Sequence, residues 1–160
     1  MGKTKRKLST MEEKKNIPQD IHPIQVVTKI RSTRERVWET ITTPQLMRQW
    51  FADVDNETMM DGETFRFLEM FGNLQMVHEC LILEMVKPSL FRHTWAYPEL
   101  SQASSTVNWD LESDGDLTEV IITHEGIHHI TPDIPELTPQ RLIGFWDSAL
   151  NNYLKKFIER

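Results

Sequence analysis

Histidine and carboxylate side chains gather in two stretches whose chemistry could serve a metal ion. The first contains His124, Glu125, His128, His129 and Asp133, and the second contains Asp53, Asp55, Glu57 and Asp61. Imidazole and carboxylate groups are the usual zinc ligands, and carboxylates suit calcium. The spacing is loose in both, because the histidines straddle Gly126 and the acidic run lacks the glycine and final glutamate of an EF-hand loop. We therefore expect exposed or hydrogen-bonded histidines and a solvated acidic edge, with no metal and no other cofactor.

Nucleophilic catalysis has one candidate, the lone cysteine Cys80. It stands between Glu79 and Leu81 in an apolar run, where a cysteine is usually an inert small hydrophobe, since a thiolate needs a nearby positive charge. The sequence contains no Gly-x-Ser-x-Gly elbow, no phosphate-binding glycine loop and no dinucleotide fingerprint. Catalysis by these routes is not expected.

Aromatic and polar residues on the expected strands and the last helix form a more informative set. As a ligand site we single out Trp50, Phe65, Phe67, His78, Trp95, Asn108, Trp109, His124, Trp146 and Leu150. The plain alternative is a filled core, because tryptophans are commonly buried with a partner for the indole N–H. Burying His78 or His124 without a partner costs about 1–3 kcal/mol, so each is expected to meet a protein group, water or ligand. An enzyme would need titratable groups aimed into the same space, and the available ones are His78, His93, His124 and Glu69.

These residues must be positioned by a long amphipathic helix at residues 138–158. Thr138 followed by Pro139 is typical of a helix start, since the hydroxyl can cap free N–H groups and proline fits the first helical position. Apolar residues then recur at three- and four-residue steps, namely Leu142, Phe145, Trp146, Ala149, Leu150, Tyr153, Leu154 and Phe157. This stripe needs a large apolar partner, and the strand-like chain before it predicts that the partner is one face of a sheet.

The chain before this helix reads as strands interrupted early by two short helices. Residues 24–30 predict a first strand, Ser32-Thr33-Arg34-Glu35 has the spacing of a capping box, and Thr43-Pro44 repeats the cap-plus-proline start. Turn residues then separate six strand-like runs at 53–58, 63–70, 74–86, 90–97, 104–112 and 116–124. Short connections make neighbouring strands antiparallel. Apolar residues alternate with a period of two, except in residues 80–86, where the pattern does not assign the inward face.

The predicted fold is therefore α+β. A strand, two short helices and a six-strand antiparallel meander form a curved sheet wrapped around the long C-terminal helix. The gap between helix and sheet is the expected ligand site. We expect residues 23–160 to form this one domain and residues 1–22 to be a disordered basic tail.

Charge and composition limit the partners. Residues 1–20 carry six basic and three acidic side chains, so the rest of the chain holds a net charge of −9 within the total of −6. A domain this acidic is not expected to bind nucleic acid. No apolar run approaches the roughly 18 to 20 residues of a membrane span, and the start lacks a secretory signal. Together with the single cysteine, these features predict a cytoplasmic protein without integral membrane contact.

Eight short motifs in a fixed order resemble a known family. They are Ile30-Arg31-Ser32-Thr33-Arg34-Glu35-Arg36-Val37-Trp38, Thr42-Thr43-Pro44, Arg48-Gln49-Trp50-Phe51, Leu83-Glu84-Met85-Val86-Lys87-Pro88, Phe91-Arg92-His93-Thr94-Trp95, Val107-Asn108-Trp109-Asp110-Leu111, Thr123-His124-Glu125-Gly126-Ile127 and Gly144-Phe145-Trp146. Over residues 24–158 the chain resembles the activator of heat-shock protein ATPase homologue-like family of the START-like helix-grip superfamily (SRPBCC). The resemblance implies the helix-grip fold. It also implies a range of functions, since the superfamily includes lipid and sterol carriers, aromatic polyketide cyclases, binders of small hydrophobic ligands, stress proteins and a domain of a chaperone activator.

Three functions follow as alternatives, because a fold alone does not choose among them. The leading hypothesis is reversible binding of a largely apolar small molecule, lipid-like or aromatic, without chemical change. The second is a cyclase- or hydrolase-type enzyme that uses the same cavity. The third is a chaperone-interacting protein. It ranks last because the chaperone activator contacts its chaperone through an additional amino-terminal domain, and residues 1–23 are too short to be that domain.

Overall fold

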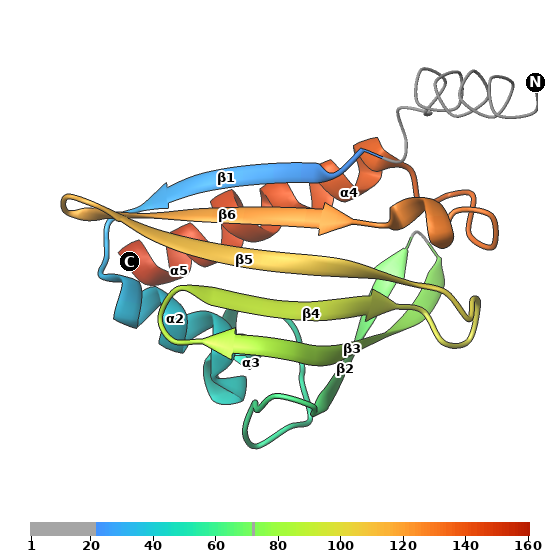
Figure 1. Ribbon diagram of the computed structural model, residues 1–160, viewed down its shortest axis with the longest axis horizontal. Coiled ribbons are helices and arrows are strands. Elements are labelled where there is room, and N and C mark those ends of the chain that lie inside the picture. Colours follow the sequence, from blue (N-terminus) through green and yellow to red (C-terminus); the bar gives the residue numbers. More distant parts are fainter. Residues whose placement is uncertain (1–21, 72) are drawn as a thin grey trace, which may run out of the picture.

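The computed structural model describes residues 22–71 and 73–160, and they form a curved antiparallel sheet with helices on one side (Figure 1). The strands are β1 (Ile24–Ile30), β2 (Thr64–Phe71), β3 (Leu74–Val86), β4 (Leu90–Ala96), β5 (Ser104–Asp114) and β6 (Leu117–Glu125). Their order across the sheet is β1-β6-β5-β4-β3-β2, so five strands follow one another as a meander and β1 pairs with the last of them. The predicted tail at residues 1–22 lies outside the described residues, apart from His22.

Two short helices, α2 (Arg34–Thr42) and α3 (Pro44–Trp50), lie between β1 and β2 along the chain. The C-terminal helix is continuous and has three parts: α4 (Pro139–Asp147), a π-helical segment η3 (Ser148–Leu154) and α5 (Lys155–Glu159). A 3-10 turn, η2 (Ile127–His129), follows β6. Figure 1 shows the long helix running behind β1 and β6, with α2 and α3 beside its C-terminal end. This arrangement confirms the α+β helix-grip fold. None of the helices in residues 22–71 and 73–160 is long and apolar enough to cross a membrane.

One predicted strand is wrong. Residues 53–58 form an irregular loop, so the sheet has six strands in all and its meander has five. The Arg48 guanidinium of α3 donates hydrogen bonds to the Val54 and Asn56 carbonyls at 2.8 and 2.7 Å. These carbonyls are therefore bound to the preceding helix and are not available for a strand ladder.

The predicted helix starts differ in how they are capped. Thr33 and Thr138 each accept a hydrogen bond from the backbone N–H three residues later. The sequence predicted the cap at Thr138, but its capping box placed the earlier cap at Ser32, one residue before Thr33. Thr43 makes no such bond, although Pro44 does occupy the first turn of α3. Thr43 also ends α2, where its own N–H donates to the Glu39 carbonyl and its hydroxyl contacts the Glu39 carboxylate at 3.4 Å.

The structure shows which side chains of strand β3 face inward, which the sequence did not assign. Met76, His78, Cys80 and Ile82 are buried, whereas Leu81 and Leu83 are exposed. The pairing of β3 with β4 shifts between Ile82 and Glu84. The sequence pattern failed because Leu81 and Leu83 are apolar at exposed positions, and the β-bulge interrupts the period of two after Ile82.

The core is the space between the sheet and the C-terminal helix. Leu142, Trp146, Ala149, Leu150, Leu154 and Ile158 of the helix are buried there, which confirms most of the predicted stripe. They meet Phe65 and Phe67 of β2, Phe91 and Trp95 of β4, Val107 and Trp109 of β5, and Val120 and Ile122 of β6 within one cluster. Tyr153 departs from the stripe and is 60% exposed.

Candidate functional site

Seven of the ten predicted ligand-site residues lie fully inside the core. Phe65, His78, Trp95, Trp109, His124, Trp146 and Leu150 have at most 3% of their surface exposed. Trp50 and Phe67 are also largely buried, but they line a surface groove as well. Asn108 does not join this set. It lies on the opposite face of β5, where it accepts a hydrogen bond from Arg92 Nε at 2.8 Å. The period of two that turns Trp109 inward turns its neighbour Asn108 outward.

Each buried indole N–H in this cluster has an acceptor. Trp109 donates to His93 Nε2 and Trp146 donates to His124 Nδ1, both at 3.0 Å. Trp95 donates to the Tyr97 hydroxyl and Trp50 to the Thr40 carbonyl, both at 2.9 Å. These four indole N–H groups are therefore satisfied within the protein, as buried polar groups generally are.

His93 and His124 are neutral acceptors in this network. Burial lowers the pKa of His93 to about 4 and that of His124 to about 3. The remaining nitrogen of His93 contacts the Thr94 carbonyl at 2.8 Å, and that of His124 contacts the Ser105 hydroxyl at 2.6 Å. With both nitrogens engaged and a pKa far below neutral, neither ring is suited to proton transfer at pH 7. Burial also raises the pKa of Cys80, which opposes thiolate formation.

The interior between α3 and the sheet is nearly filled. The space enclosed by Trp50, Phe65, His93, Trp95 and Trp109 with their neighbours amounts to about 10 Å³. A cavity of that size is about the minimum that one water molecule needs. Aromatic side chains therefore occupy most of the space between α3 and the sheet.

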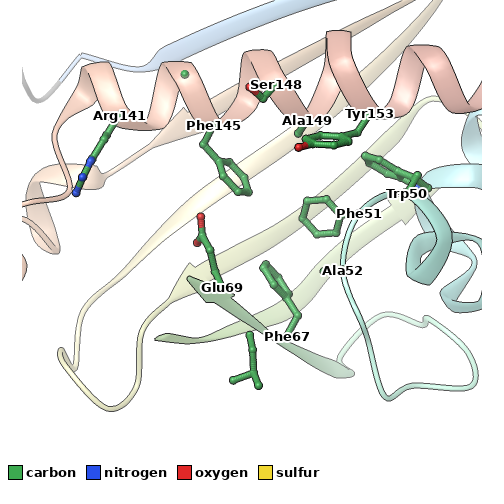
Figure 2. A pocket seen from close by; sticks show the side chains of 12 residues that line it. Trp50, Phe51, Ala52, Phe67, Glu69, Arg141, Phe145, Ser148, Ala149 and Tyr153 are labelled. Carbon is green, nitrogen blue, oxygen red and sulfur yellow. The ribbon is translucent and has the colours of Figure 1, made fainter. Parts of the chain in front are cut away.

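An open groove lies at the rim of the core, where β2 faces the C-terminal helix. A groove of about 420 Å³ runs between the end of α3, the inner face of β2 and the segment α4–η3. Figure 2 shows Phe51 and Phe67 on one wall and Phe145 projecting from the helix on the other, with Trp50 and Tyr153 at one end. Gly144 has no side chain and contributes only its backbone to the groove. A Cβ built at this position meets nothing within 4 Å, so the space beside it is open. The remaining lining comes from Ala52, Leu68, Glu69, Arg141, Ser148 and Ala149.

One ionisable pair reaches from the groove into the core. The Glu69 carboxylate lines the groove and contacts Nε2 of His78, the ring of which is fully buried. His78 stacks on Phe67 with ring centroids 4.6 Å apart, and it lies 4.4 Å from the ring of Tyr97. Its Nδ1 has no hydrogen-bond partner among the described residues. Of the acid–base candidates named from the sequence, Glu69 alone lines the groove.

The sequence did not predict Phe51, Gly144 and Ser148 as groove residues, and it predicted Phe145 and Tyr153 only as part of the apolar stripe of the helix. Gly144 could have been singled out from the sequence. A glycine inside a helix lowers its stability, so its presence there often indicates a packing or binding role. The metal hypothesis gains no support. Within the described part of the chain, no three histidine, cysteine, aspartate or glutamate side chains are grouped to hold an ion. Asp133 instead accepts a hydrogen bond from the Ser101 hydroxyl at 2.6 Å.

Solved structures with the same fold include proteins from several bacteria. DynU16, a putative protein in the dynemicin biosynthetic locus, has a TM-score of 0.71 and 19% identity, over 89% of this chain and 48% of its own. The chain therefore spans about half the length of DynU16. CalU16 from Micromonospora echinospora has a TM-score of 0.63 and 21% identity, over 85% of this chain and 73% of its own.

A third structure, the Aha1 dimer from Colwellia psychrerythraea, has a TM-score of 0.67 and 19% identity, over 86% of this chain and 96% of its own. Identities this low establish the shared fold alone. No curated protein sequence gives a significant match. The sequence model of one family matches residues 31–156, which is most of the chain. The chain thus belongs to the family described as Activator of Hsp90 ATPase homolog 1-like protein.

Proposed function

We propose that this domain reversibly binds a largely apolar small molecule in the groove between β2 and the C-terminal helix, without transforming it. The observation that carries the proposal is the contrast between the two spaces. The enclosed space between α3 and the sheet measures only about 10 Å³, whereas the aromatic-lined groove measures about 420 Å³. Ligand pockets commonly measure about 300–1,000 Å³ and combine apolar walls with a few polar groups.

Membership of the family supports the proposal, since helix-grip proteins include carriers of apolar molecules. The groove has suitable walls, because Phe51 makes edge-to-face contacts with Phe67 and Phe145 at centroid distances of 5.1 and 6.4 Å. Such rings offer rigid apolar area to a guest. Of the predicted ligand-site residues, Trp50 and Phe67 remain in this proposal. His78, Trp95 and Trp146 contact the wall residues Phe67 and Phe145 from the core side.

A fluorescence titration with N-phenyl-1-naphthylamine, a neutral apolar probe, tests the proposal. We expect saturable binding to the wild type and none to Gly144→Leu, whose side chain would enter the groove without meeting protein atoms at Cβ. Ile143→Ala is the matched control, because Ile143 is 45% exposed on the same helix and does not line the groove. It should bind the probe like the wild type.

Other outcomes favour the alternatives. Equal binding by Gly144→Leu and the wild type would contradict the groove as the site. Chemical conversion of a bound molecule that stops on substituting Glu69 would favour an enzyme. The third outcome is that N-phenyl-1-naphthylamine does not bind and that a pull-down from lysate recovers a heat-shock chaperone in stoichiometric amount. A role in chaperone contact would then replace the binding proposal.

A further inference from the structure

The groove contains a carboxylate on its inner wall, and we infer that Glu69 anchors a positively charged amine group of the ligand. The preferred ligand is then an aromatic or aliphatic amine, whose apolar part packs on the ring walls while its ammonium group meets Glu69. This inference rests on the proposed function and adds the chemical class of the guest.

Glu69 is placed to meet a guest inside the groove. It follows Phe67 on the inner face of β2, and only 21% of its side chain is exposed. Figure 2 shows its carboxylate pointing toward the C-terminal helix, near Phe145. One oxygen, Oε2, contacts His78, and no hydrogen bond to Oε1 is found among the described residues. A partly buried carboxylate with an oxygen to spare is a strong acceptor for an ammonium N–H.

His78 holds that carboxylate from below. Its ring is fully buried, stacked on Phe67, and offers Nε2 to Glu69. This contact engages Oε2 of the carboxylate, and Oε1 is left to face a guest in the groove.

The walls favour the same class of guest. The faces of Phe67, Phe145 and Trp50 carry the negative part of the ring quadrupole, which attracts organic cations. The net charge of −9 beyond residue 20 also attracts cations from solution. Arg141 is the opposing charge in the lining, but it is exposed at the rim, where water and salt weaken its field more than that of Glu69.

Three probes with one ring system test the inference: 2-naphthylmethylamine, 2-naphthylmethanol and 2-naphthoate, measured by calorimetry at pH 7. We expect the wild type to bind the amine about tenfold more tightly than the alcohol, in line with one charge-assisted hydrogen bond, and to bind the carboxylate least. High salt should reduce the preference for the amine.

Variants assign the preference to Glu69. Glu69→Gln should lose the advantage of the amine and keep the affinity for the alcohol, which also shows that its groove is intact. Glu79→Gln is the matched control, because it removes one carboxylate from the outer face of β3, where Glu79 pairs with Arg66 at 2.6 Å. It should keep the preference. If Glu69→Gln does not fold, the wild-type comparison at low and high salt still decides.

The inference is overturned if the wild type binds the amine and the alcohol equally, if it prefers the carboxylate, or if Glu69→Gln keeps the full preference. In each of these cases, binding of N-phenyl-1-naphthylamine that Gly144→Leu abolishes leaves the proposed function standing. If that probe also fails to bind, the proposed function fails together with the inference.

Discussion

His93 and His124 show how single polar residues are used in this interior. Both stand at inward positions of apolar strands, and each accepts a hydrogen bond from an indole N–H at 3.0 Å. The sequence predicted that such a residue meets a partner, and for these two that prediction is confirmed. Their partners, Trp109 and Trp146, lie in the same cluster, so the pairs fix the orientation of the largest side chains of the core.

Substitution of Trp146 tests the strength of this arrangement. Trp146 is fully buried, so Trp146→Ala is expected to lower the free energy of unfolding by about 3–5 kcal/mol. Trp146→Phe keeps most of the ring but leaves His124 Nδ1 without its donor, and a loss of about 1–3 kcal/mol is expected. Urea denaturation measures both. Tyr153→Ala, at a 60% exposed position of the same helix, should change stability by less than about 0.5 kcal/mol. A native-like stability of Trp146→Ala would contradict its place in the core.

Among the helices, the start of each one depends on local hydrogen bonds that the sequence predicts only in part. The Thr138 hydroxyl accepts from Arg141 N–H at 3.3 Å, so Thr138→Ala should cost about 1 kcal/mol. Thr43→Ala is the matched control. Thr43 is also followed by a proline at a helix start, but its side chain makes no capping hydrogen bond. Thermal melts should separate the two variants. Equal losses would show that the cap on α4 contributes nothing of its own.

The middle of the C-terminal helix has a weak point at Gly144. A glycine inside a helix costs about 0.5–1 kcal/mol relative to alanine, and an added Cβ at this position meets nothing within 4 Å. We therefore expect Gly144→Ala to raise the melting temperature while it narrows the groove only slightly. A lower melting temperature would show that the helix backbone needs glycine there for another reason.

Much of the fold at this scale could be predicted from the sequence. The stripe from Leu142 to Leu154 and the alternation in β4, β5 and β6 follow from burial on one face. Residues 53–58 could not be predicted, because the bonds from Arg48 that shape this loop are tertiary contacts. The bulge after Ile82 likewise depends on pairing with β4, which residues 80–86 do not encode by themselves.

For the whole molecule, the buried imidazoles predict a loss of stability in acid. The folded-state pKa values of about 4 for His93 and about 3 for His124 lie below the ordinary value of 6.5. The unfolded chain therefore takes up protons first as the pH falls below 6.5, and the stability that the neutral rings contribute at higher pH is lost toward pH 4.

Urea denaturation between pH 8 and pH 5 measures this effect before most carboxylates titrate. The free energy of unfolding should be nearly flat from pH 8 to 7 and should fall between pH 6.5 and 5. His129→Gln, at an exposed position, should leave the profile unchanged. A profile that stays flat down to pH 5 would contradict the placement of the two buried rings.

The candidate site was less predictable than the fold, for a physical reason. Periodicity indicates which side chains point inward, but it does not indicate whether they fill the space that they enclose. Trp95, Trp109 and Trp146 do fill it, with neighbouring ring centroids 5.1 and 5.5 Å apart. The groove depends instead on residues at the margin of the stripe, such as Phe145 and Tyr153, whose partial exposure follows from the curvature of the sheet.

Chemical labelling of Cys80 can report on opening of the sheet. Cys80 is the one cysteine of the sequence, it is fully buried opposite Phe65, and burial raises the pKa of its thiol. A thiol reagent should therefore label the native protein only when β2 separates from β3, so that the labelling rate measures how often this hairpin opens. Phe67 and Glu69 of β2 line the groove. A guest bound there must then slow the labelling of Cys80 as its occupancy rises, even though it never touches the sulfur.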